Sequence, residues 1–386
     1  MQKIKVLYIS SWYPSKEHST LGNFVQKHAE AIQPFVELEV LYVTSSSTDS
    51  IEHAVINGVS TTIVYYKKVT SKIPLISNLL KYKKSIEAFD KGLDFLAKNR
   101  AFSAIDLVHC NVSFPAGYFA LEMKRRNNIP FLLTEHWTAF SKGTNGYQNF
   151  NYLTKKAIQQ TVKEASLLLP VSESLKTDMG DLGLKQKFKV VPNVVDCNLF
   201  LPKENKENER IKILHVSTMD DKQKNATGLL NVIKKITNYR TDFELQIVSD
   251  DNFEQTTNLI QKLELTAFVT LEQTKTTAEI VNYFQSADFF LLFSNYETFS
   301  VVLAESWSCG VPAVYSNSGG LTTLNNPKLG IQVEVGNELE LEKAIVNLLD
   351  NYKNYSSETI RQFALENFTK EAIGKEIFAC YQTVLK

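Results

Sequence analysis

Short, unbroken apolar runs recur along the first half of the chain, separated by longer segments whose apolar residues are spaced as on one face of a helix. Runs rich in valine, isoleucine and leucine are typical of strands that are buried on both faces of a parallel sheet. Their alternation with helices predicts a doubly wound α/β domain. The runs cover residues 6–10, 36–43, 107–110, 131–134 and 167–171.

The same pattern begins again after a charged, asparagine-rich segment at 203–210, which has no apolar periodicity and is interpreted as a linker. Two α/β domains in tandem leave a cleft, and ligands of such sheets bind beyond the carboxyl ends of the strands. We therefore expect the functional site between the domains. The second set of predicted strands covers residues 211–217, 243–249, 268–271, 289–293 and 312–315.

The last segment, 369–385, has the pattern of an amphipathic helix. Ile373, Ile377, Tyr381 and Leu385 follow one another at the spacing of one helix face. We expect this helix to close the fold.

Length and composition are those of a folded protein with two domains. The chain has 386 residues, of which 44% are hydrophobic and 11% aromatic, and this length suits two domains of ordinary size. Its 42 basic and 42 acidic residues leave no net charge. The overall charge therefore gives no reason to expect a nucleic-acid partner.

Two features favour a cytoplasmic location. The first apolar run is too short for the core of a signal peptide, and no segment approaches the roughly 18 consecutive apolar residues of a membrane-spanning helix. The cysteines show neither a C-x-x-C pair nor metal-ligand spacing, which favours a reducing compartment over a disulfide framework or a zinc site. The four cysteines are Cys110, Cys197, Cys309 and Cys380.

The most informative segment is 294–314, SNYETFSVVLAESWSCGVPAV. A helix is expected to begin shortly after Glu297 and to carry Glu305 on its second turn. The first backbone N–H groups of that helix have no partner within it and form a natural phosphate site, which beside carboxylates suits a nucleotide sugar. The alternative is that Glu297 caps the helix and Glu305 is solvated. The amides concerned are those of Phe299, Ser300 and Val301.

This segment carries a resemblance to a known family. The stretch ETFSVVLAE, followed by CGVPAV and then by SGG at 318–320, resembles the retaining glycosyltransferases of family four, whose signature is two glutamates separated by seven residues. The resemblance implies the GT-B fold, in which two Rossmann-like domains face each other across a cleft. In that fold a C-terminal helix crosses back to the first domain.

The resemblance also implies the domain limits. Residues 1–192 would form the N-terminal acceptor domain, joined by a returning helix at 366–386. Residues 193–365 would form the C-terminal domain that binds the nucleotide-sugar donor. The segment 191–200 resembles the passage between the domains, so its implied role is structural.

By the same resemblance, Glu297 faces the donor sugar and Glu305 binds the ribose hydroxyls. The amides after Phe299 hold the phosphate. Gly319 and Gly320 let the backbone approach the donor, and an ordinary turn that needs a positive φ is the alternative.

Residues 215–225 resemble the strand and loop where the family places an arginine and, six residues later, a lysine on the donor's diphosphate. Lys224 occupies the place of the lysine, and a solvent-facing loop lysine is the alternative. Thr218 stands where the arginine is expected, which removes a permanent charge from the diphosphate pocket. Either Lys222 compensates, or the donor binds more weakly.

Two residues of the first half have counterparts in the family. His136 follows the run 131–134 and resembles a strand-end histidine that hydrogen-bonds a sugar hydroxyl or positions the reacting atoms. A structural histidine is the alternative, and it is the favoured interpretation for His109 on another strand end. Gly22 lies in a segment that resembles the glycine loop where the acceptor meets the donor phosphate, with a simple turn glycine as the alternative.

The resemblance implies retaining transfer of a hexosyl group from a UDP- or GDP-linked sugar to a glycan or lipid-linked acceptor, in surface polysaccharide biosynthesis. The chain contains no Asp-x-Asp triplet, so no metal is expected, and the nucleotide sugar is a substrate rather than a cofactor. Lys224, helix dipoles and amides would stabilise the leaving diphosphate.

Three other functions come into consideration. A sugar-nucleotide epimerase of the same fold would consume no acceptor. An inactive nucleotide-sugar-binding subunit is suggested by Thr218 in place of the arginine. A dinucleotide dehydrogenase is disfavoured, because no G-x-G-x-x-G follows the first strand.

A basic segment makes an anionic membrane surface a candidate partner, which would place the protein on the cytoplasmic face of a membrane. Basic amphipathic segments dock on anionic lipid, and here lysines surround the apolar residues 73–80. The alternative is a helix with one core face and ordinary lysine solvation. The lysines are Lys67, Lys68, Lys72, Lys81, Lys83 and Lys84.

Overall fold

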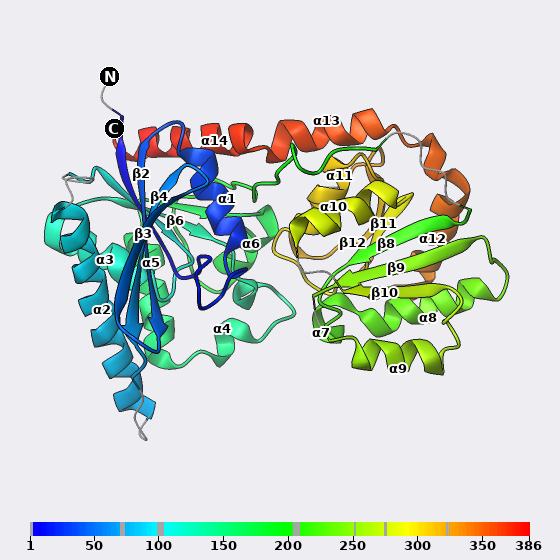
Figure 1. Ribbon diagram of the computed structural model, residues 1–386, viewed down its shortest axis with the longest axis horizontal. Helices are drawn as coiled ribbons and strands as arrows, with labels where there is room; N and C mark the ends of the chain where they lie inside the picture. The colour runs from blue at the N-terminus through cyan, green and yellow to red at the C-terminus, as the bar shows by residue number, and fades with distance from the viewer. Residues whose placement is uncertain are drawn as a thin grey trace.

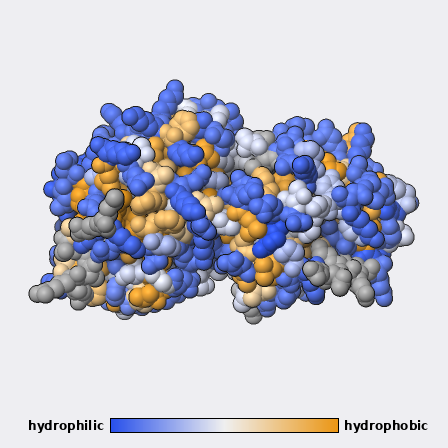
Figure 2. Space-filling model, turned by 90° about the horizontal axis from the view of Figure 1, so that it is seen from above, coloured by the Kyte–Doolittle hydropathy of each residue, from blue (hydrophilic) through white to orange (hydrophobic). Residues whose placement is uncertain are grey.

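The computed structural model describes residues 3–69, 74–98, 104–203, 209–250, 252–273, 276–321, 323 and 325–386. In Figure 1 these residues form two α/β domains side by side, each built on one twisted sheet. Seen from above in Figure 2, the domains are two lobes that meet at a narrow waist. The two Rossmann-like sheets predicted from the sequence are therefore confirmed. Most of the predicted linker, at 204–208, lies outside the described residues.

The sheet of the first domain has, within the described residues, the strand order β3-β4-β2-β1-β5-β6-β7. Every pair is parallel except the edge pair of β3 and β4. All five strands predicted for this half are present. The strands are β1 (Lys5–Ser10), β2 (Glu37–Ser46), β3 (Ser50–Ile56), β4 (Val59–Lys67), β5 (Leu107–Asn111), β6 (Phe131–Glu135) and β7 (Leu167–Pro170).

The hairpin of β3 and β4 was not among the predicted strands. Asn57 and Gly58 form its turn, with φ values of 49° and 82°. Two-residue turns with positive φ at both positions match the right-handed twist of the strands they join. The Asn-Gly pair was thus a sequence signal for this hairpin.

The second sheet has, in the described part of the chain, the order β10-β9-β8-β11-β12-β13, and all its pairs are parallel. All five strands predicted for this half are present, and β13 is an addition. The strands are β8 (Ile211–Val216), β9 (Phe243–Ser249), β10 (Val269–Gln273), β11 (Phe289–Leu292), β12 (Ala313–Ser316) and β13 (Gly330–Val333).

Helices cover both faces of each sheet. In the first domain, Tyr8 belongs to the cluster with residues of α1 and α14, while its neighbour Leu7 belongs to the cluster with residues of α2 and α3. The first-domain helices are α1 (Asn23–Ile32), α2 (Pro74–Lys98), α3 (Gly117–Asn127), α4 (Gly146–Asn149), α5 (Tyr152–Glu164) and α6 (Glu173–Asp181). The others are α7 (Asp221–Lys224), α8 (Ala226–Thr237), α9 (Glu254–Lys262), α10 (Thr277–Ser286), α11 (Val301–Ser308), α12 (Glu338–Asn351), α13 (Ser357–Phe368) and α14 (Lys370–Val384).

The chain crosses between the domains twice. It leaves the first domain at 191–200 and returns through α13 and α14, which run along the top of both domains in Figure 1. α14 packs on α1 so closely that a Cβ on Gly374 would lie 2.1 Å from the Ala31 carbonyl oxygen. The returning helix predicted from the sequence is therefore confirmed. The two crossings are joined by a hydrogen bond of 2.9 Å from Val195 N to Phe368 O.

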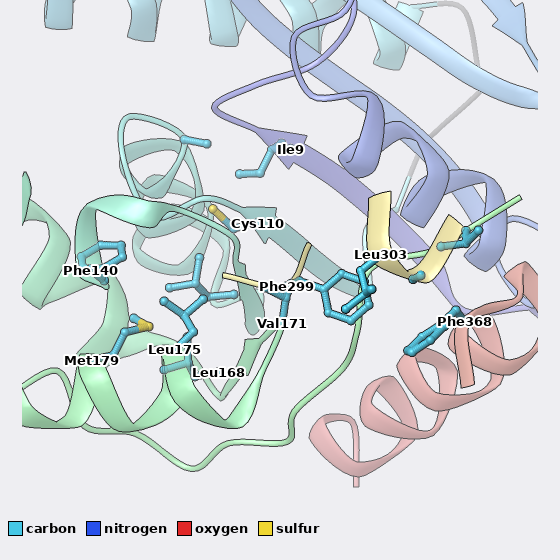
Figure 3. Packing of buried hydrophobic residues seen from close by; sticks show 14 of the residues in the cluster. Ile9, Cys110, Phe140, Leu168, Val171, Leu175, Met179, Phe299, Leu303 and Phe368 are labelled. Atoms are coloured by element: carbon cyan, nitrogen blue, oxygen red, sulfur yellow. The ribbon is translucent and has the colours of Figure 1, made fainter. Parts of the chain in front are cut away.

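One hydrophobic cluster contains residues from both domains. Figure 3 shows Phe299 beside Leu303 of α11, with Phe368 on one side and Val171 and Leu175 of the first domain on the other. The segment that precedes α11 is thus packed against the first domain, which brings its polar residues to the waist between the lobes.

Candidate functional site

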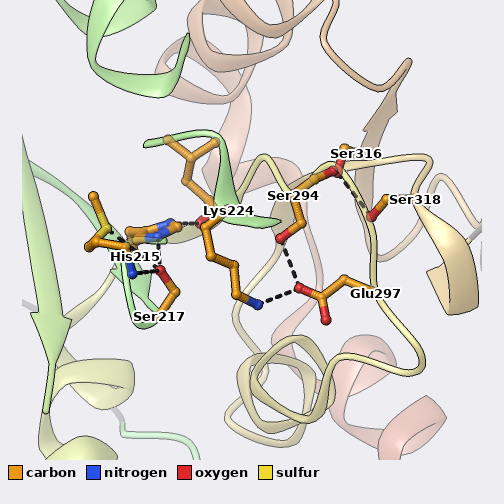
Figure 4. Close-up of polar contacts among 9 residues, drawn as sticks. His215, Ser217, Lys224, Ser294, Glu297, Ser316 and Ser318 are labelled. Atoms are coloured by element: carbon orange, nitrogen blue, oxygen red, sulfur yellow. Dashed lines mark hydrogen bonds and ion pairs between the residues drawn. The ribbon is translucent and has the colours of Figure 1, made fainter. Parts of the chain in front are cut away.

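Glu297 lies beyond the carboxyl end of the second sheet, between β11 and α11. Its side chain is 7% exposed, and the Lys224 ammonium at the end of α7 lies 2.5 Å from Glu297 Oε1. Ser294 Oγ donates a hydrogen bond to the same oxygen at 2.8 Å, as Figure 4 shows. Glu297 is therefore not a helix cap and Lys224 is not a solvent-facing loop lysine, so those two alternatives are wrong.

The loop that carries Glu297 is tied to α7 by Asn295. The backbone N–H of Asn295 donates to Gln223 O at 2.7 Å, and Asn295 Nδ2 donates to Lys222 O at 3.0 Å. The side chains of Lys222 and Thr218 are exposed. Within the described residues Lys222 forms no ion pair, so Lys224 is the residue of this loop that is held at the site.

The start of α11 has the properties of an anion-binding site. Ser300 precedes the helix with φ 64°, in the left-handed region, and its hydroxyl does not cap the helix. That hydroxyl is buried and has no hydrogen-bond partner among the described residues. A strained residue with an unsatisfied donor is often part of a ligand site. The N–H groups of Phe299, Ser300 and Val301 lie at this helix start, as predicted, where backbone amides lack intrahelical partners.

Glu305 lies on the second turn of α11, as predicted, but it is not solvated. The residue is 7% exposed, and burial raises the pKa of its carboxyl to about 7. The Lys27 ammonium on α1 lies 3.7 Å from Glu305 Oε1 and partly offsets this rise. A carboxylate with so little solvent favours neighbours that donate hydrogen bonds, such as hydroxyl groups.

Gly319 and Gly320 pack against the backbone of the Glu297 loop. A Cβ on Gly319 would lie 1.7 Å from Glu297 O, and a Cβ on Gly320 would lie 2.1 Å from Thr298 O. Gly319 also has φ 51°. The turn interpretation of Gly319 therefore holds, and the close approach shown here is to another loop of the same domain.

Gly22 immediately precedes α1 and has φ 79°. A Cβ at this position would lie 2.5 Å from Trp12 O. The glycine thus allows the start of α1 to lie directly against the loop that follows β1. Lys27 lies on the same helix, α1.

His136 follows β6 and is 5% exposed. Its Nδ1 lies 2.9 Å from Asn193 Oδ1, whereas its Nε2 is buried without a partner among the described residues. Burial, together with His28, lowers the pKa of His136 well below its usual value. The imidazole is therefore neutral at physiological pH, so one nitrogen can accept a hydrogen bond.

The turn around His136 is shaped by Glu135, which sequence reasoning had not singled out. The Glu135 carboxylate accepts the backbone N–H groups of Ser113, His136 and Trp137 at 2.9–3.1 Å, and burial raises its pKa. His109 is a structural histidine, because its two ring nitrogens lie 2.6 Å from Tyr381 and Thr134 hydroxyls.

Sequence reasoning also missed Lys27, His28 and Asn193. His28 is fully buried, with its ring centroid 5.2 Å from that of His136. Lys27 and His28 are consecutive residues of α1, which begins directly after Gly22. That glycine was the one nearby residue that the sequence had linked to the site. Asn193 lies in the segment that was interpreted as a structural passage.

Part of the basic segment can be placed. Lys72 and Ile73 lie outside the described residues, whereas Lys81, Lys83 and Lys84 are exposed on α2. Leu79 and Leu80 of the same helix are 67% and 36% exposed. Among the described helices none combines the length and the apolar content that crossing a bilayer requires.

Comparison with known proteins gives a consistent result. The family model described as "Glycosyl transferases group 1" matches residues 198–363, and the model described as "Glycosyltransferase Family 4" matches residues 33–199. A probable sucrose-phosphate synthase of Thermosipho melanesiensis is 26% identical over 278 residues, which are 66% of this chain and 64% of that protein. The match therefore spans less than two thirds of the length of that relative.

Solved structures share the whole fold. The sucrose-phosphate synthase of Thermosynechococcus elongatus superposes with a TM-score of 0.77 at 18% identity, covering 98% of this chain and 99% of that one. HepE of Anabaena, solved in complex with UDP-glucose, has a TM-score of 0.71 at 15% identity and covers 98% of this chain and 100% of that one.

Proposed function

Because the chain belongs to the group 1 glycosyl transferases of family 4, we propose that it moves a hexosyl group from a nucleotide sugar to an acceptor without a metal ion. The observation that carries the proposal is the pair of buried carboxylates, Glu297 and Glu305, on either side of a helix start whose Ser300 hydroxyl has no partner among the described residues. Fixed charges and unsatisfied donors in one place are costly unless a ligand uses them.

The diphosphate of the donor is assigned to the start of α11. The backbone amides of Phe299, Ser300 and Val301 provide donors, and the helix dipole favours the negative charge. The Lys224 ammonium is held beside the site by Glu297. With Thr218 in place of an arginine, we expect the diphosphate to depend strongly on Lys224.

The sugar and the ribose are assigned to the carboxylates. Glu305 accepts hydrogen bonds from the ribose hydroxyls, and Glu297 faces the transferred sugar. His136 offers its free Nε2 to a sugar hydroxyl. Gly22, Gly319 and Gly320 hold the surrounding backbone where the donor and acceptor meet.

The reaction proposed is a same-face displacement with retention of configuration. The bond between the anomeric carbon and the phosphate oxygen breaks, and the acceptor oxygen forms a bond to the same carbon. The leaving phosphate takes the proton of the acceptor hydroxyl. Lys224 and the α11 amides stabilise the charge that develops on this phosphate, which is the kind of preorganised electrostatics that dominates many enzymes. Glu297 polarises and positions the sugar and is not assigned as a nucleophile.

The donor proposed for the first trials is UDP-glucose, because HepE binds UDP-glucose and has the same fold. GDP-linked sugars are the second group of donors to be tested. The acceptor proposed is a glycan or a lipid-linked sugar of surface polysaccharide biosynthesis, taken up on the cytoplasmic side.

A membrane surface is proposed as the place where the acceptor is met. Leu79 and Leu80 are exposed on α2 beside Lys81 and Lys83, and exposed apolar residues among lysines suit an anionic lipid surface. Sedimentation with vesicles containing an anionic lipid tests this idea. Replacing Lys81 and Lys83 by glutamine should weaken binding to anionic vesicles, and unchanged binding would exclude this surface.

The donor site is tested by thermal unfolding with a panel of nucleoside diphosphates and nucleotide sugars. A ligand at 100 times its dissociation constant adds roughly 2.7 kcal/mol to the free energy of unfolding. A shift with one base that disappears in Glu305→Ala would support the assignment. Absence of any shift would favour the inactive-subunit alternative, and turnover of donor to an epimer without acceptor would favour the epimerase.

A further inference from the structure

The first residues of the passage between the domains hold two buried histidines. His28 Nε2 lies 3.1 Å from the Pro192 carbonyl oxygen, and His136 Nδ1 lies 2.9 Å from Asn193 Oδ1. Oxygens of this kind only accept hydrogen bonds, so the proton of each neutral ring lies on the nitrogen that faces the passage. Two adjacent residues, Pro192 and Asn193, therefore fix the tautomers of both histidines.

The opposite nitrogen of each ring is left with a free lone pair. His28 Nδ1 and His136 Nε2 are both buried and have no hydrogen-bond partner among the described residues. The two ring centroids are 5.2 Å apart, so the unsatisfied acceptors belong to one small region. Buried acceptors without a donor are costly, and a hydroxyl group supplies the missing donor.

His109 shows what a merely structural histidine looks like in this fold. Both of its ring nitrogens are bonded to side-chain hydroxyls of the protein, from Tyr381 and Thr134. His136, at the end of the neighbouring strand, has one nitrogen bonded and one left free. The two residues thus differ in one atom: His136 Nε2 has no hydrogen-bond partner among the described residues, whereas both ring nitrogens of His109 have one.

We propose that Asn193 is a positioning residue of the transfer reaction, whose side-chain oxygen holds His136 in the tautomer that presents Nε2 to a substrate hydroxyl. This inference rests on the proposed function for the substrate, although the tautomer itself does not. Asn193 does not act on the substrate directly. It is 5% exposed, and the contact it makes at the site is with the His136 ring.

The groups around the His136 ring keep the ring uncharged. The titratable groups around the His136 ring are His28 on α1, His109 on β5 and Glu135, which directly precedes it. Burial is the main reason why an imidazolium is disfavoured at His136, and the two neighbouring histidines disfavour it further. A negative charge at position 193 would reverse that balance, because an anion beside Nδ1–H stabilises the protonated ring.

The experiment compares Asn193→Asp with Asn193→Leu. Aspartate keeps an oxygen that accepts from Nδ1–H, whereas leucine keeps only the approximate shape. We expect N193L to lower kcat for UDP release from UDP-glucose by about 10- to 100-fold at every pH, by analogy with the loss that follows when the hydrogen-bond partner of a metal-binding histidine is removed. With UDP-glucose kept saturating at every pH, so that a change in donor affinity does not affect the rate, kcat of N193D should fall at low pH where kcat of the unaltered protein does not, and should recover at higher pH.

The matched control is Asn151→Asp, which makes the same exchange at the N-cap of α5, where Asn151 Oδ1 accepts from Thr154 N at 3.0 Å. Its pH profile should not change. A flat profile for N193D, failure of N193D to recover at high pH, or full activity of N193L would each overturn the proposal.

A second measurement does not depend on turnover. The ¹⁵N signals of the histidine rings in the free protein report which nitrogen carries the proton, and His136→Gln identifies the signals of His136. We expect a protonated Nδ1 and an unprotonated Nε2, with this pattern lost in N193L. A protonated Nε2 in the unaltered protein would overturn the inference even if the enzyme transfers sugar. If UDP-glucose is not turned over, the proposed donor fails, and the ring signals alone decide the role of Asn193.

Discussion

The Lys27 ammonium lies 3.7 Å from Glu305 Oε1, and the two residues belong to different domains. Lys27 lies on α1 of the first domain, whereas Glu305 lies on α11 of the second. The residue proposed to bind ribose is therefore in contact with the first domain. If ribose binds at Glu305 as proposed, this ion pair links donor binding to the arrangement of the two domains.

The pH dependence of donor binding should report Glu305. If its carboxylate accepts the ribose hydroxyls, it must be ionised, and its pKa of about 7 makes affinity for UDP-glucose fall below neutral pH by about tenfold per pH unit. Lys27→Met removes a positive charge that favours the ionised form, so the midpoint should move to higher pH. Calorimetric titration at several pH values measures both.

The control for this shift is Lys5→Met, because Lys5 lies 3.8 Å from Glu37 in an ion pair between two residues of the first domain. In Lys5→Met, the pH at the midpoint of the change in UDP-glucose affinity should equal that of the unaltered protein. A pH-independent affinity in the unaltered protein would contradict the ribose assignment, and Glu305→Gln should produce that behaviour.

The free energy of unfolding should depend on pH because the carboxyl group of Glu305 is buried. Its pKa is raised from 4.5 to about 7 in the fold, so the folded state binds more protons than the unfolded state between these values. Stability is therefore lost as pH rises through this window, by about 3 kcal/mol at most. We expect Glu305→Gln to be more stabilising near pH 8 than near pH 5, as measured by urea unfolding. An equal effect at both pH values would mean that the carboxylate is not buried in solution.

Lys224 should be important for stability as well as for transfer. Lys224→Met leaves the Glu297 carboxylate, whose side chain is 7% exposed, without its cation. Breaking a buried pair by removing one partner costs about 3 kcal/mol or more. Lys224→Met combined with Glu297→Gln should recover most of that loss in urea unfolding, while transfer remains abolished.

Lys375→Met provides the comparison for Lys224. Lys375 pairs with Glu371 at 2.5 Å on one helix, with 63% and 74% of the side chains exposed. Loss of this exposed pair should change stability far less than Lys224→Met does, because exposed ion pairs contribute little. If Lys224→Met were as mild, the ion pair with Glu297 would not form in solution.

Gly319 should not tolerate a side chain. Gly319→Ala would place a Cβ 1.7 Å from Glu297 O, so the Glu297 loop must move and donor binding should be lost. Gly336→Ala is the matched control, because Gly336 has φ 73° and a Cβ added there would meet no heavy atom within 4 Å among the described residues. That control should cost only about 1 kcal/mol for the left-handed backbone. Thermal unfolding with and without UDP-glucose measures the stability and the donor binding of each variant. Equal losses of stability and of donor binding in Gly319→Ala and Gly336→Ala would contradict the packing argument.

The sequence was informative where local pattern decides structure. The buried strands of both sheets form continuous apolar runs, and Glu297 and Glu305 are placed by the strand and helix that flank them. Their ion-pair partners could not be predicted. Lys224 lies 73 residues away from Glu297 along the chain, and Lys27 lies in the other domain from Glu305. Partners so distant along the chain are set by packing alone.

The role of Asn193 was missed for the same reason. In the sequence it belongs to an irregular segment between two domains, and nothing nearby indicates a histidine partner. The contact with His136 spans 57 residues. Such a contact exists only because β6 ends at the point where the passage leaves the first domain.

The two segments that cross between the domains are fastened to each other and together form a hinge. Val195 N donates to Phe368 O at 2.9 Å, and the Arg361 guanidinium donates to the carbonyl oxygens of Cys197 and Phe200. Two connecting segments that are bonded to each other can bend together about one axis, but they resist twisting and stretching. Any movement of one lobe relative to the other should therefore be a rocking motion about these two crossings, which keeps the lobes from twisting or sliding apart.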